Sequence, residues 1–324
     1  MPYNYKIAPI HSAEAKVFAN LVALREDVTS LVPLIYLEYY LSSEIARRTE
    51  RSEYDLNDLY MYTDIHCHLN LKDYGSVDEL IQSCLNSGVD RIVTVGFDVP
   101  SSEMCKNIAE WYDQVYFTAG LHPTELARCS FSDLQRIEEL CAHPKCIGIG
   151  EIGLDYHYPD TDKERQHQFF KAQLELASKL KMPVQIHSRD CAEDTLNFLK
   201  ANRALLANGF LLHCYSYSPE MVGDFLSLGA YFSFGGTSTF KRSKKPRRAI
   251  AAIPVDRLLT ETDSPYLSPS SAFGQFPNTP RSIPEITRNM AEIKGIGERE
   301  MCYVVRDNAE RLFPKLKNES ANKK

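Results

Sequence analysis

The sequence lacks the features of secreted and membrane-spanning proteins. Its nine cysteines include no CxxC pair, which favours reduced thiols over a disulfide framework. The first residues, "MPYNYKIAPIHSAEAK", do not have the basic-then-apolar layout of a signal peptide. The longest apolar run, "LVPLIYLEYYL", is short and is interrupted by Glu38. We therefore expect a cytoplasmic protein without membrane association, or a nuclear one if the source is eukaryotic.

An excess of positive charge is also missing. The 324 residues include 37 Lys and Arg against 43 Asp and Glu, for a net charge of -6. Binding to a polyanion would therefore depend on a local basic patch. Six of the eight residues from Lys241 to Arg248 are basic, so this segment is the candidate patch. A run of charge can equally be a solvated face or a nuclear signal.

From residue 61 onward, one unit recurs along the chain: a short apolar run followed by a stretch with helical periodicity. Eight such units predict a parallel sheet covered by helices, closed as a (β/α)8 TIM barrel of the α/β class, with an open doubly wound sheet as the alternative. The expected strands are 61–67, 91–96, 115–120, 146–151, 183–188, 209–214, 230–235 and 257–262. Helices are expected within 77–88, 131–143, 163–181, 218–229 and 299–313, the last of them packed on the end of the barrel.

Residues 1–60 fall outside this periodicity. They contain two amphipathic patterns, which predict a helical N-terminal extension. Such an extension could cap the outer ring of the barrel or dock a protein partner. The expected organisation is this extension, a barrel domain over 61–314, and a disordered tail over 315–324.

Residues of metal-ligand type lie at the expected strand ends. In a barrel of this kind, the carboxyl ends of the strands surround one mouth, where side chains from distant parts of the chain meet. A lone histidine at a strand end is usually structural, but six candidate ligands at one mouth favour a metal centre. Two cations could share a hydroxide there and stabilise charge on the attacking and leaving oxygens. The six residues are His66, His68, Glu151, His187, His213 and Asp263.

Other polar residues near the expected mouth are candidates for substrate contact. His122 ends the third strand without an obvious ligand vacancy to fill, which favours a role beside the metal ligands or at the substrate. Arg189 could meet a phosphate with its forked guanidinium, or pair with Asp190 or Glu193. Lys241 and Arg242 begin the basic run after the seventh strand. Four further histidines are expected to be structural or exposed: His11, His143, His157 and His167.

Eight motifs in this order resemble the TatD-type metal-dependent deoxyribonucleases of the amidohydrolase superfamily. The resemblance covers about residues 62–313. The motifs are "DIHCHL", "AGLHP", "IGEIGLDYH", "QIHSRD", "LLHCYS", "YFSFGGTSTFK", "ETDSPYL" and "PNTP".

The resemblance implies a TIM-type barrel that hydrolyses DNA phosphodiesters, often from the 3′ end of single strands, with Mg²⁺ or another divalent ion. It matches the six candidate ligands to the metal-binding positions of the family. It also implies that Asp263 accepts a proton from the nucleophilic water and that Glu151 bridges the ions. On chemistry alone, histidine-rich ligands favour Zn²⁺ or Mn²⁺. Asp64 is expected to be a supporting or structural acid.

Two departures from the family pattern bear on the substrate. Tyr217 stands where a glycine is common, so it could narrow entry or stack on a base. The basic run from Lys241 is denser than the family pattern and favours a polyanion. A metal-dependent hydrolase of an ester or amide, such as aminoacyl-tRNA, remains an alternative. So does a barrel scaffold that recruits a partner through residues 1–60.

Overall fold

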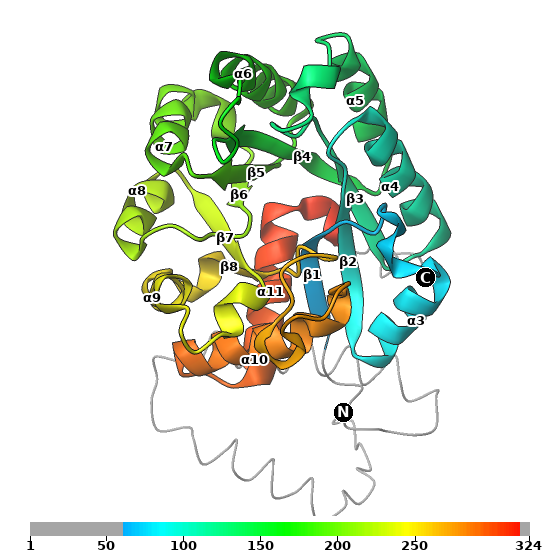
Figure 1. Cartoon of the computed structure of the whole chain (residues 1–324), viewed down its shortest axis with the longest axis vertical. Coiled ribbons are helices and arrows are strands. Elements are labelled where there is room, and N and C mark those ends of the chain that lie inside the picture. Colours follow the sequence, from blue (N-terminus) through cyan, green and yellow to red (C-terminus); the bar gives the residue numbers. More distant parts are fainter. Residues whose placement is uncertain (1–60, 318–324) are drawn as a thin grey trace, which may run out of the picture. The chain divides into compact units, whose positions relative to one another are not determined.

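The computed structural model describes residues 61–317, and within them the predicted barrel is confirmed (Figure 1). Eight strands form one sheet in chain order, every neighbouring pair is parallel, and helices surround the sheet. The strands are β1 (Tyr62–Cys67), β2 (Val89–Val95), β3 (Val115–Ala119), β4 (Cys146–Asp155), β5 (Val184–Arg189), β6 (Phe210–Leu212), β7 (Ala230–Phe234) and β8 (Leu258–Thr260).

Some of the helices begin where the sequence supplies a side-chain cap. The Ser76 side chain accepts a hydrogen bond from the backbone of Glu79, and Asp98 forms a capping box with Ser101. Each helix then turns an apolar stripe toward the sheet. They are α3 (Val77–Asn86), α4 (Val99–Trp111), α5 (Asp133–Cys141), α6 (Lys163–Leu180), α7 (Ala192–Ala201), α8 (Val222–Ser227), α9 (Lys244–Ala252), α10 (Ile283–Lys294) and α11 (Glu298–Leu312).

A buried aspartate joins the last strand to the first. Asp64 on β1 accepts hydrogen bonds from the Thr262 backbone at 3.0 Å and from the Thr262 hydroxyl at 2.6 Å. The Thr260 hydroxyl donates to the Thr63 carbonyl at 2.6 Å, and the Asp263 amide donates to the His66 carbonyl at 3.0 Å. These contacts place β8 beside β1, which excludes the open-sheet alternative.

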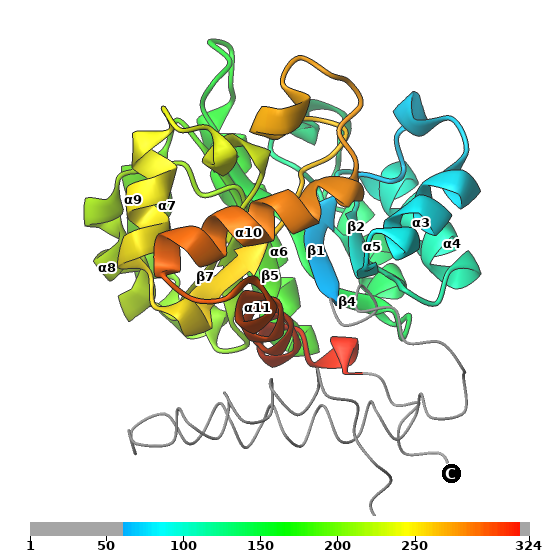
Figure 2. The same cartoon turned by 90° about the horizontal axis from the view of Figure 1, so that it is seen from below.

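Helix α11 covers the end of the barrel opposite the mouth formed by the carboxyl ends of the strands, as predicted (Figure 2). Asn308 donates to the carbonyl of Leu258 at 2.9 Å, next to the start of β8. The ordered chain continues into a short 3-10 helix, Pro314–Leu316, in which Leu316 is fully buried. The predicted tail boundary at 315 therefore comes too early, because Leu316 still contributes to the core.

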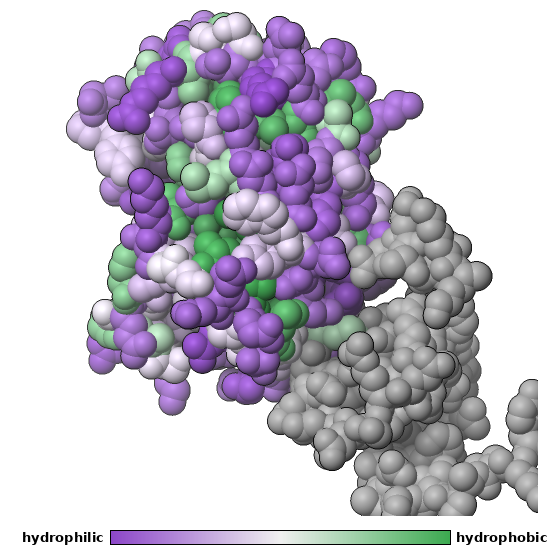
Figure 3. All heavy atoms as spheres, turned by 90° about the vertical axis from the view of Figure 1, so that its right-hand side faces the viewer, coloured by the Kyte–Doolittle hydropathy of each residue, from purple (hydrophilic) through white to green (hydrophobic). Residues whose placement is uncertain are grey.

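The segments that follow the strands gather on the other side. In Figure 2, the segment after β1 and the orange loop between β8 and α10 both project away from α11. Hydrophilic residues cover most of the face over α3 to α5, with small hydrophobic areas between them (Figure 3).

All nine cysteines are unpaired, consistent with the expected reduced thiols. Between residues 61 and 317, no helix has the length and apolarity needed to cross a bilayer.

Residues 1–60 and 318–324 lie outside the described part of the chain. The helical extension, its protein partner, the scaffold alternative and the remainder of the disordered tail stay predictions. His11 belongs to the same undescribed segment.

Candidate metal centre

The six predicted ligands come together at the mouth, although two of them lie elsewhere on their strands than expected. Glu151 does not end β4, which continues to Asp155. It lies instead where the pairing of β4 with β5 shifts register, between Ile149 and Ile152. Asp263 follows the end of β8 at Thr260 by a short segment. The lengths of β4 and β8 therefore differ from the prediction, but the six residues still meet at the mouth of the barrel.

His66, His68 and Asp263 form what we call the first ligand group, beside Oε2 of Glu151. The His66 Nε2 atom lies 3.5 Å from Glu151 Oε2 and 3.7 Å from Asp263 Oδ1. The His68 Nε2 atom lies 3.4 Å from Asp263 Oδ1 and 3.8 Å from Glu151 Oε2. Asp263 has a φ of 51°, a left-handed backbone that costs about 1–3 kcal/mol outside glycine. Its position is therefore maintained against local strain.

His187 and His213 form the second ligand group, beside the other oxygen of Glu151. Glu151 Oε1 lies 2.7 Å from His187 Nδ1 and 2.7 Å from His213 Nε2. These two nitrogens are 3.1 Å apart. The His213 ring also stacks on His66 with 4.0 Å between centroids, so the two groups adjoin. Glu151 thus presents one oxygen to each group.

In each ligand histidine, one ring nitrogen faces the centre (the front nitrogen) and the other faces away from it (the rear nitrogen). The rear nitrogens of His66, His68 and His187 lie within hydrogen-bond distance of acceptors, which directs the lone pair of each front nitrogen toward the centre. His66 Nδ1 lies 2.7 Å from the Gln185 amide oxygen, whose nitrogen donates to the Ile65 carbonyl. His68 Nδ1 lies 3.1 Å from the Val95 carbonyl. In the second group, His187 Nε2 lies 3.0 Å from Asp155 Oδ2, whereas His213 Nδ1 lies 3.7 Å from Glu261 Oε2 and has no hydrogen-bond partner among residues 61–317. This is the usual support of a metal-binding histidine.

His122 is oriented in the opposite sense. The Thr124 backbone N–H donates to His122 Nδ1 at 3.2 Å, and an N–H can only donate, so this nitrogen carries the lone pair. The proton of the neutral ring is then on Nε2, which lies 3.4 Å from Glu151 Oε1. His122 is within reach of the centre, but in this tautomer it presents a donor rather than a ligand. The role of His122 beside the ligands or at the substrate stays a prediction.

The donor set fits divalent cations. His66 Nε2 is fully buried and has no hydrogen-bond partner among residues 61–317, an arrangement that is costly unless a ligand satisfies it. Ligand atoms about 2.1 Å from a tetrahedral ion lie ~3.4 Å from one another. The separations in the first group, from 3.4 to 3.8 Å, are close to that value. Histidine nitrogens with carboxylate oxygens suit Zn²⁺ or Mn²⁺ better than the all-oxygen sites of Mg²⁺.

Charge coupling holds the carboxylates ionised. Burial favours neutral Glu151, but the neighbouring histidines, His213 above all, hold the pKa of Glu151 well below its usual value. Burial also opposes ionisation of Asp263, yet the hydrogen bond from His68 and nearby histidine charges lower the pKa of Asp263. The pKa of His213 is raised, because the charge of Glu151 outweighs the effect of burial. In a metal-free centre, protons on the histidines therefore balance the carboxylates.

The predicted substrate contacts surround the centre at different depths. Arg189 ends β5 and is exposed, and its guanidinium has no ion pair with the described residues, including Asp190 and Glu193. The Tyr217 hydroxyl lies 2.9 Å from the Ser188 hydroxyl, so this side chain packs beside β5. Lys241 and Arg242 are exposed in the turn before α9. No helix was expected in the basic run, but Lys244 to Arg248 form the start of α9.

Three supporting residues were not predicted: Asp155, Gln185 and Glu261. Each stands inside a quoted motif, and Gln185 and Glu261 lie two residues before a candidate ligand, where strand alternation would place both side chains on one face. A polar residue in an apolar strand was the available signal. The other described histidines contact carboxylates away from the ligands: His143 with Glu110, His157 with Asp190 and His167 with Asp194.

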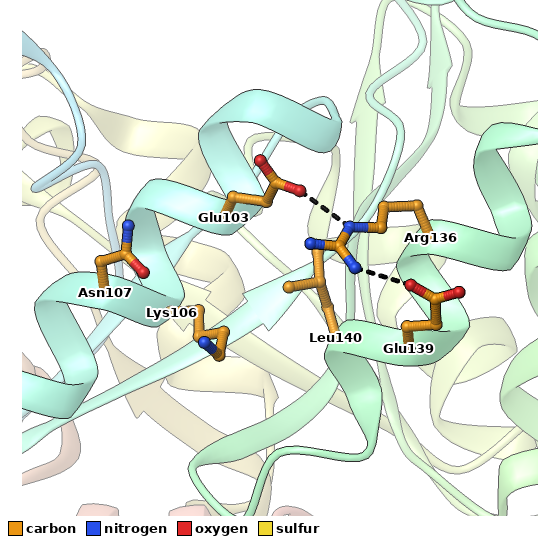
Figure 4. Close-up of a pocket in the computed structure, with 6 residues that line it drawn as sticks. All are labelled: Glu103, Lys106, Asn107, Arg136, Glu139 and Leu140. Atoms are coloured by element: carbon orange, nitrogen blue, oxygen red, sulfur yellow. Dashed lines mark hydrogen bonds and ion pairs between the residues drawn. The ribbon is translucent and has the colours of Figure 1, made fainter.

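A pocket on the outer surface lies apart from this centre (Figure 4). It is lined by residues of α4 and α5. Arg136 pairs there with Glu103 at 2.8 Å and with Glu139 at 2.6 Å, so its charge is already compensated. Ligand-type residues converge at the mouth instead.

Comparison with protein families agrees with this centre. The model for TatD-related DNases matches residues 63–314. The chain belongs to the TatD family. The metal-dependent hydrolase YabD of Bacillus subtilis is 38% identical over 254 residues, covering 78% of this chain and 99% of that protein. The metal-dependent hydrolase YcfH of Escherichia coli K12 is 35% identical over 254 residues, covering 77% of this chain and 94% of YcfH.

Solved structures of TatD proteins share the barrel. The TatD homologue YjjV from Escherichia coli K12 superimposes with a TM-score of 0.75 at 29% identity, covering 79% of this chain and 99% of YjjV. A TatD-family hydrolase from Entamoeba histolytica, at 22% identity and a TM-score of 0.68, supports the fold. The chain is thus a TatD-family metal-dependent hydrolase.

Proposed function

We propose that this protein is a divalent-metal-dependent deoxyribonuclease that shortens single-stranded DNA from its 3′ end with two metal ions. The observation that carries the proposal is the placement of Glu151, which presents Oε2 to the first ligand group and Oε1 to the second. A carboxylate in that position can hold two cations close together. The strand polarity and the choice of DNA rest on the family resemblance.

In this proposal, different residues bind the metal ions, accept a proton and donate to the phosphate. The first and second ligand groups hold the ions, which supply Lewis acidity and stabilise negative charge on the phosphate. Asp263, whose pKa is lowered, is ionised at neutral pH and would accept a proton from the attacking water, whose oxygen bonds to phosphorus as the P–O bond to the leaving nucleotide breaks. His122 donates its Nε2 proton to a phosphate oxygen, and burial keeps this ring neutral by lowering its pKa.

The basic side chains outside the centre position the strand. Arg189 has a free guanidinium at the end of β5 and can bind a backbone phosphate through two parallel hydrogen bonds. Lys241 and Arg242 add exposed positive charge, and Tyr217 lies beside β5, where its hydroxyl is 2.9 Å from that of Ser188. These contacts account for a polyanionic substrate on a protein whose net charge is -6.

The test is hydrolysis of oligonucleotides carrying a label at either end, with Mg²⁺, Mn²⁺ or Zn²⁺ added to the metal-free protein. We expect stepwise shortening from the 3′ end, faster on single than on double strands, and blocked by a 3′ cap. Glu151→Gln should lose activity by at least ~10³-fold, because the ligands act as one unit. Hydrolysis of ester or amide substrates, with all DNA left intact in the presence of each metal, would replace the proposal with the ester or amide alternative.

A further inference from the structure

Exposed aromatic side chains gather on the loop between β8 and α10. Tyr266 is 50% exposed, Phe273 79% and Phe276 61%. Leu267 on the same loop is 38% exposed, and the other exposed large hydrophobic side chains among residues 61–317 lie on other elements, such as Trp111 at the end of α4. Apolar groups left in water on one loop mark a binding surface. We call Tyr266, Phe273 and Phe276, with the neighbouring Phe240, the aromatic platform.

The aromatic platform begins at the metal centre. The Tyr266 amide donates to the carbonyl of Asp263 at 3.0 Å, and the His68 amide donates to the carbonyl of Ser264 at 2.8 Å. Tyr266 lies beside Phe276 with 6.5 Å between ring centroids. The loop projects on the same side of the barrel as the segment after β1 (Figure 2). A polymer whose backbone enters the centre would therefore pass the platform.

Hydrogen bonds and close packing hold the backbone of the loop in place before a ligand arrives. Asn278 donates to the carbonyls of Thr262 at 3.2 Å and Tyr266 at 2.8 Å. The Ser270 amide donates to the Thr239 hydroxyl at 2.8 Å. A Cβ on Gly236 would lie 2.2 Å from the Leu267 carbonyl, so the segment after β7 supports the loop closely. A preorganised surface loses little conformational entropy on binding.

Positive charge adjoins the outer end of the platform. Phe240 contacts Phe273 edge to face at 5.6 Å, and Lys241 and Arg242 follow Phe240 directly. Neither cation has an ion pair with the described residues, whereas the carboxylate of Glu285 is engaged by Ser270 and Ser271. Aromatic faces beside unpaired cations match unpaired bases on a phosphate backbone better than an apolar protein surface.

We propose that the aromatic platform stacks on unpaired bases of the nucleic-acid strand whose phosphate backbone lies at the metal centre. The inference rests on the proposed nuclease function and adds how that site distinguishes single from double strands. In a duplex, bases are paired and stacked on one another, so their faces are not free for Phe273 and Phe276. Stacking accepts any base, because every base has an aromatic face.

The first experiment measures binding without hydrolysis. Glu151→Gln protein, kept in EDTA, is titrated against a labelled single strand and a strand of equal length and charge made of abasic residues. The double variant Phe273→Ala/Phe276→Ala should bind the base-containing strand about 10-fold more weakly, with binding of the abasic strand unchanged. Phe273→Trp/Phe276→Trp should retain tight binding. Trp111→Ala, another exposed aromatic but at the far end of α4, is the matched control and should change neither affinity.

The outcomes separate the two proposals. An equal loss on both strands, or no loss on either, would overturn the platform whether or not the wild-type protein cleaves DNA. Failure of the wild-type protein to cleave any DNA would overturn the nuclease function, while the binding data still report on the rings. If the double variant binds both strands as before but loses self-association in solution, the loop is a contact between copies of the chain and the platform is again refuted.

Discussion

In both ligand groups at the mouth, histidine nitrogens face the centre. The groups differ in the partners of the histidine nitrogens that face away from it. In the first group, the rear nitrogens of His66 and His68 face neutral acceptors, the Gln185 amide and the Val95 carbonyl. In the second, His187 faces the carboxylate of Asp155 at 3.0 Å, while His213 has the carboxylate of Glu261 3.7 Å away without a hydrogen bond. A carboxylate behind a histidine raises its basicity as a ligand. We therefore expect the second group to bind its ion more tightly.

His122 borders the second group, and removing it gives the largest expected effect among the variants that probe the comparison. His122→Ala should lower kcat by about 10²–10³-fold, because a preorganised donor to the phosphate is lost. Both metal ions should remain bound, as measured by elemental analysis of the dialysed protein. His157→Ala, an exposed histidine that contacts Asp190 instead, is the control. Loss of one ion from His122→Ala would make His122 a ligand.

Asp64 supports the first group through the seam between β8 and β1. Asp64→Ala should lower the free energy of unfolding by about 2–4 kcal/mol, because the amide and hydroxyl of Thr262 lose their buried acceptor. Denaturant titration of the metal-free protein measures this. Thr63→Val is the neighbouring control, since the buried Thr63 hydroxyl has no hydrogen-bond partner among residues 61–317. Equal losses in the two variants would show that Asp64 has no special role.

Removing the negative charge behind the second group should reduce the difference in metal affinity between the two ligand groups. Asp155→Asn keeps an acceptor for His187 Nε2 but removes the negative charge. The affinity for the tighter ion should fall about 10–100-fold, with the weaker ion unaffected. Calorimetric titration of the metal-free protein with Mn²⁺ resolves the two steps. Asp190→Asn, a carboxylate that contacts His157 at 3.0 Å, should leave both steps unchanged. If only the lower-affinity binding step became weaker, the tighter ion would belong to the first ligand group instead.

The pH dependence of the metal-free protein gives the smallest expected effect. His68, His187 and His213 have pKa values raised above 6.5, so their contribution to stability is complete below pH 6.5 and is lost as pH rises through the raised values. Glu151 and Asp263 have pKa values lowered from 4.5 and 3.8, so their contribution is lost as pH falls below that range. With EDTA, stability from these groups should therefore be greatest between about pH 4.5 and 6.5.

Thermal melting in EDTA across pH 4 to 8 measures this dependence, and ~1 kcal/mol corresponds to about 2–4 °C. The stabilisation by added metal should grow as pH rises, because protons no longer compete for the histidines. A melting temperature in EDTA that climbs steadily from pH 6 to 8 would contradict the charge balance described here.

Much of the fold could be predicted because its signals are local. Eight apolar runs alternating with amphipathic stretches give a parallel barrel whatever the packing details, and the seam between β8 and β1 follows from closure. The length of β4 could not be predicted, because its continuation past Glu151 depends on pairing with β5 across a register shift. The helical start of α9 within the basic run was missed for a related reason: charge density masked its helical periodicity.

The sequence by itself determined which residue types stand near the carboxyl ends of the strands, and therefore that histidines and carboxylates would meet at one mouth. Only the tertiary structure decided how they meet. Which nitrogen of a ring faces inward depends on its rear partner, and Gln185 reaches His66 across 119 positions of the chain. The backbone N–H behind His122 gives it a front proton, while the acceptors behind His66 and His187 leave them front lone pairs. Hydrogen-bond partners so distant in the chain leave no local pattern in the sequence, because folding alone brings them together.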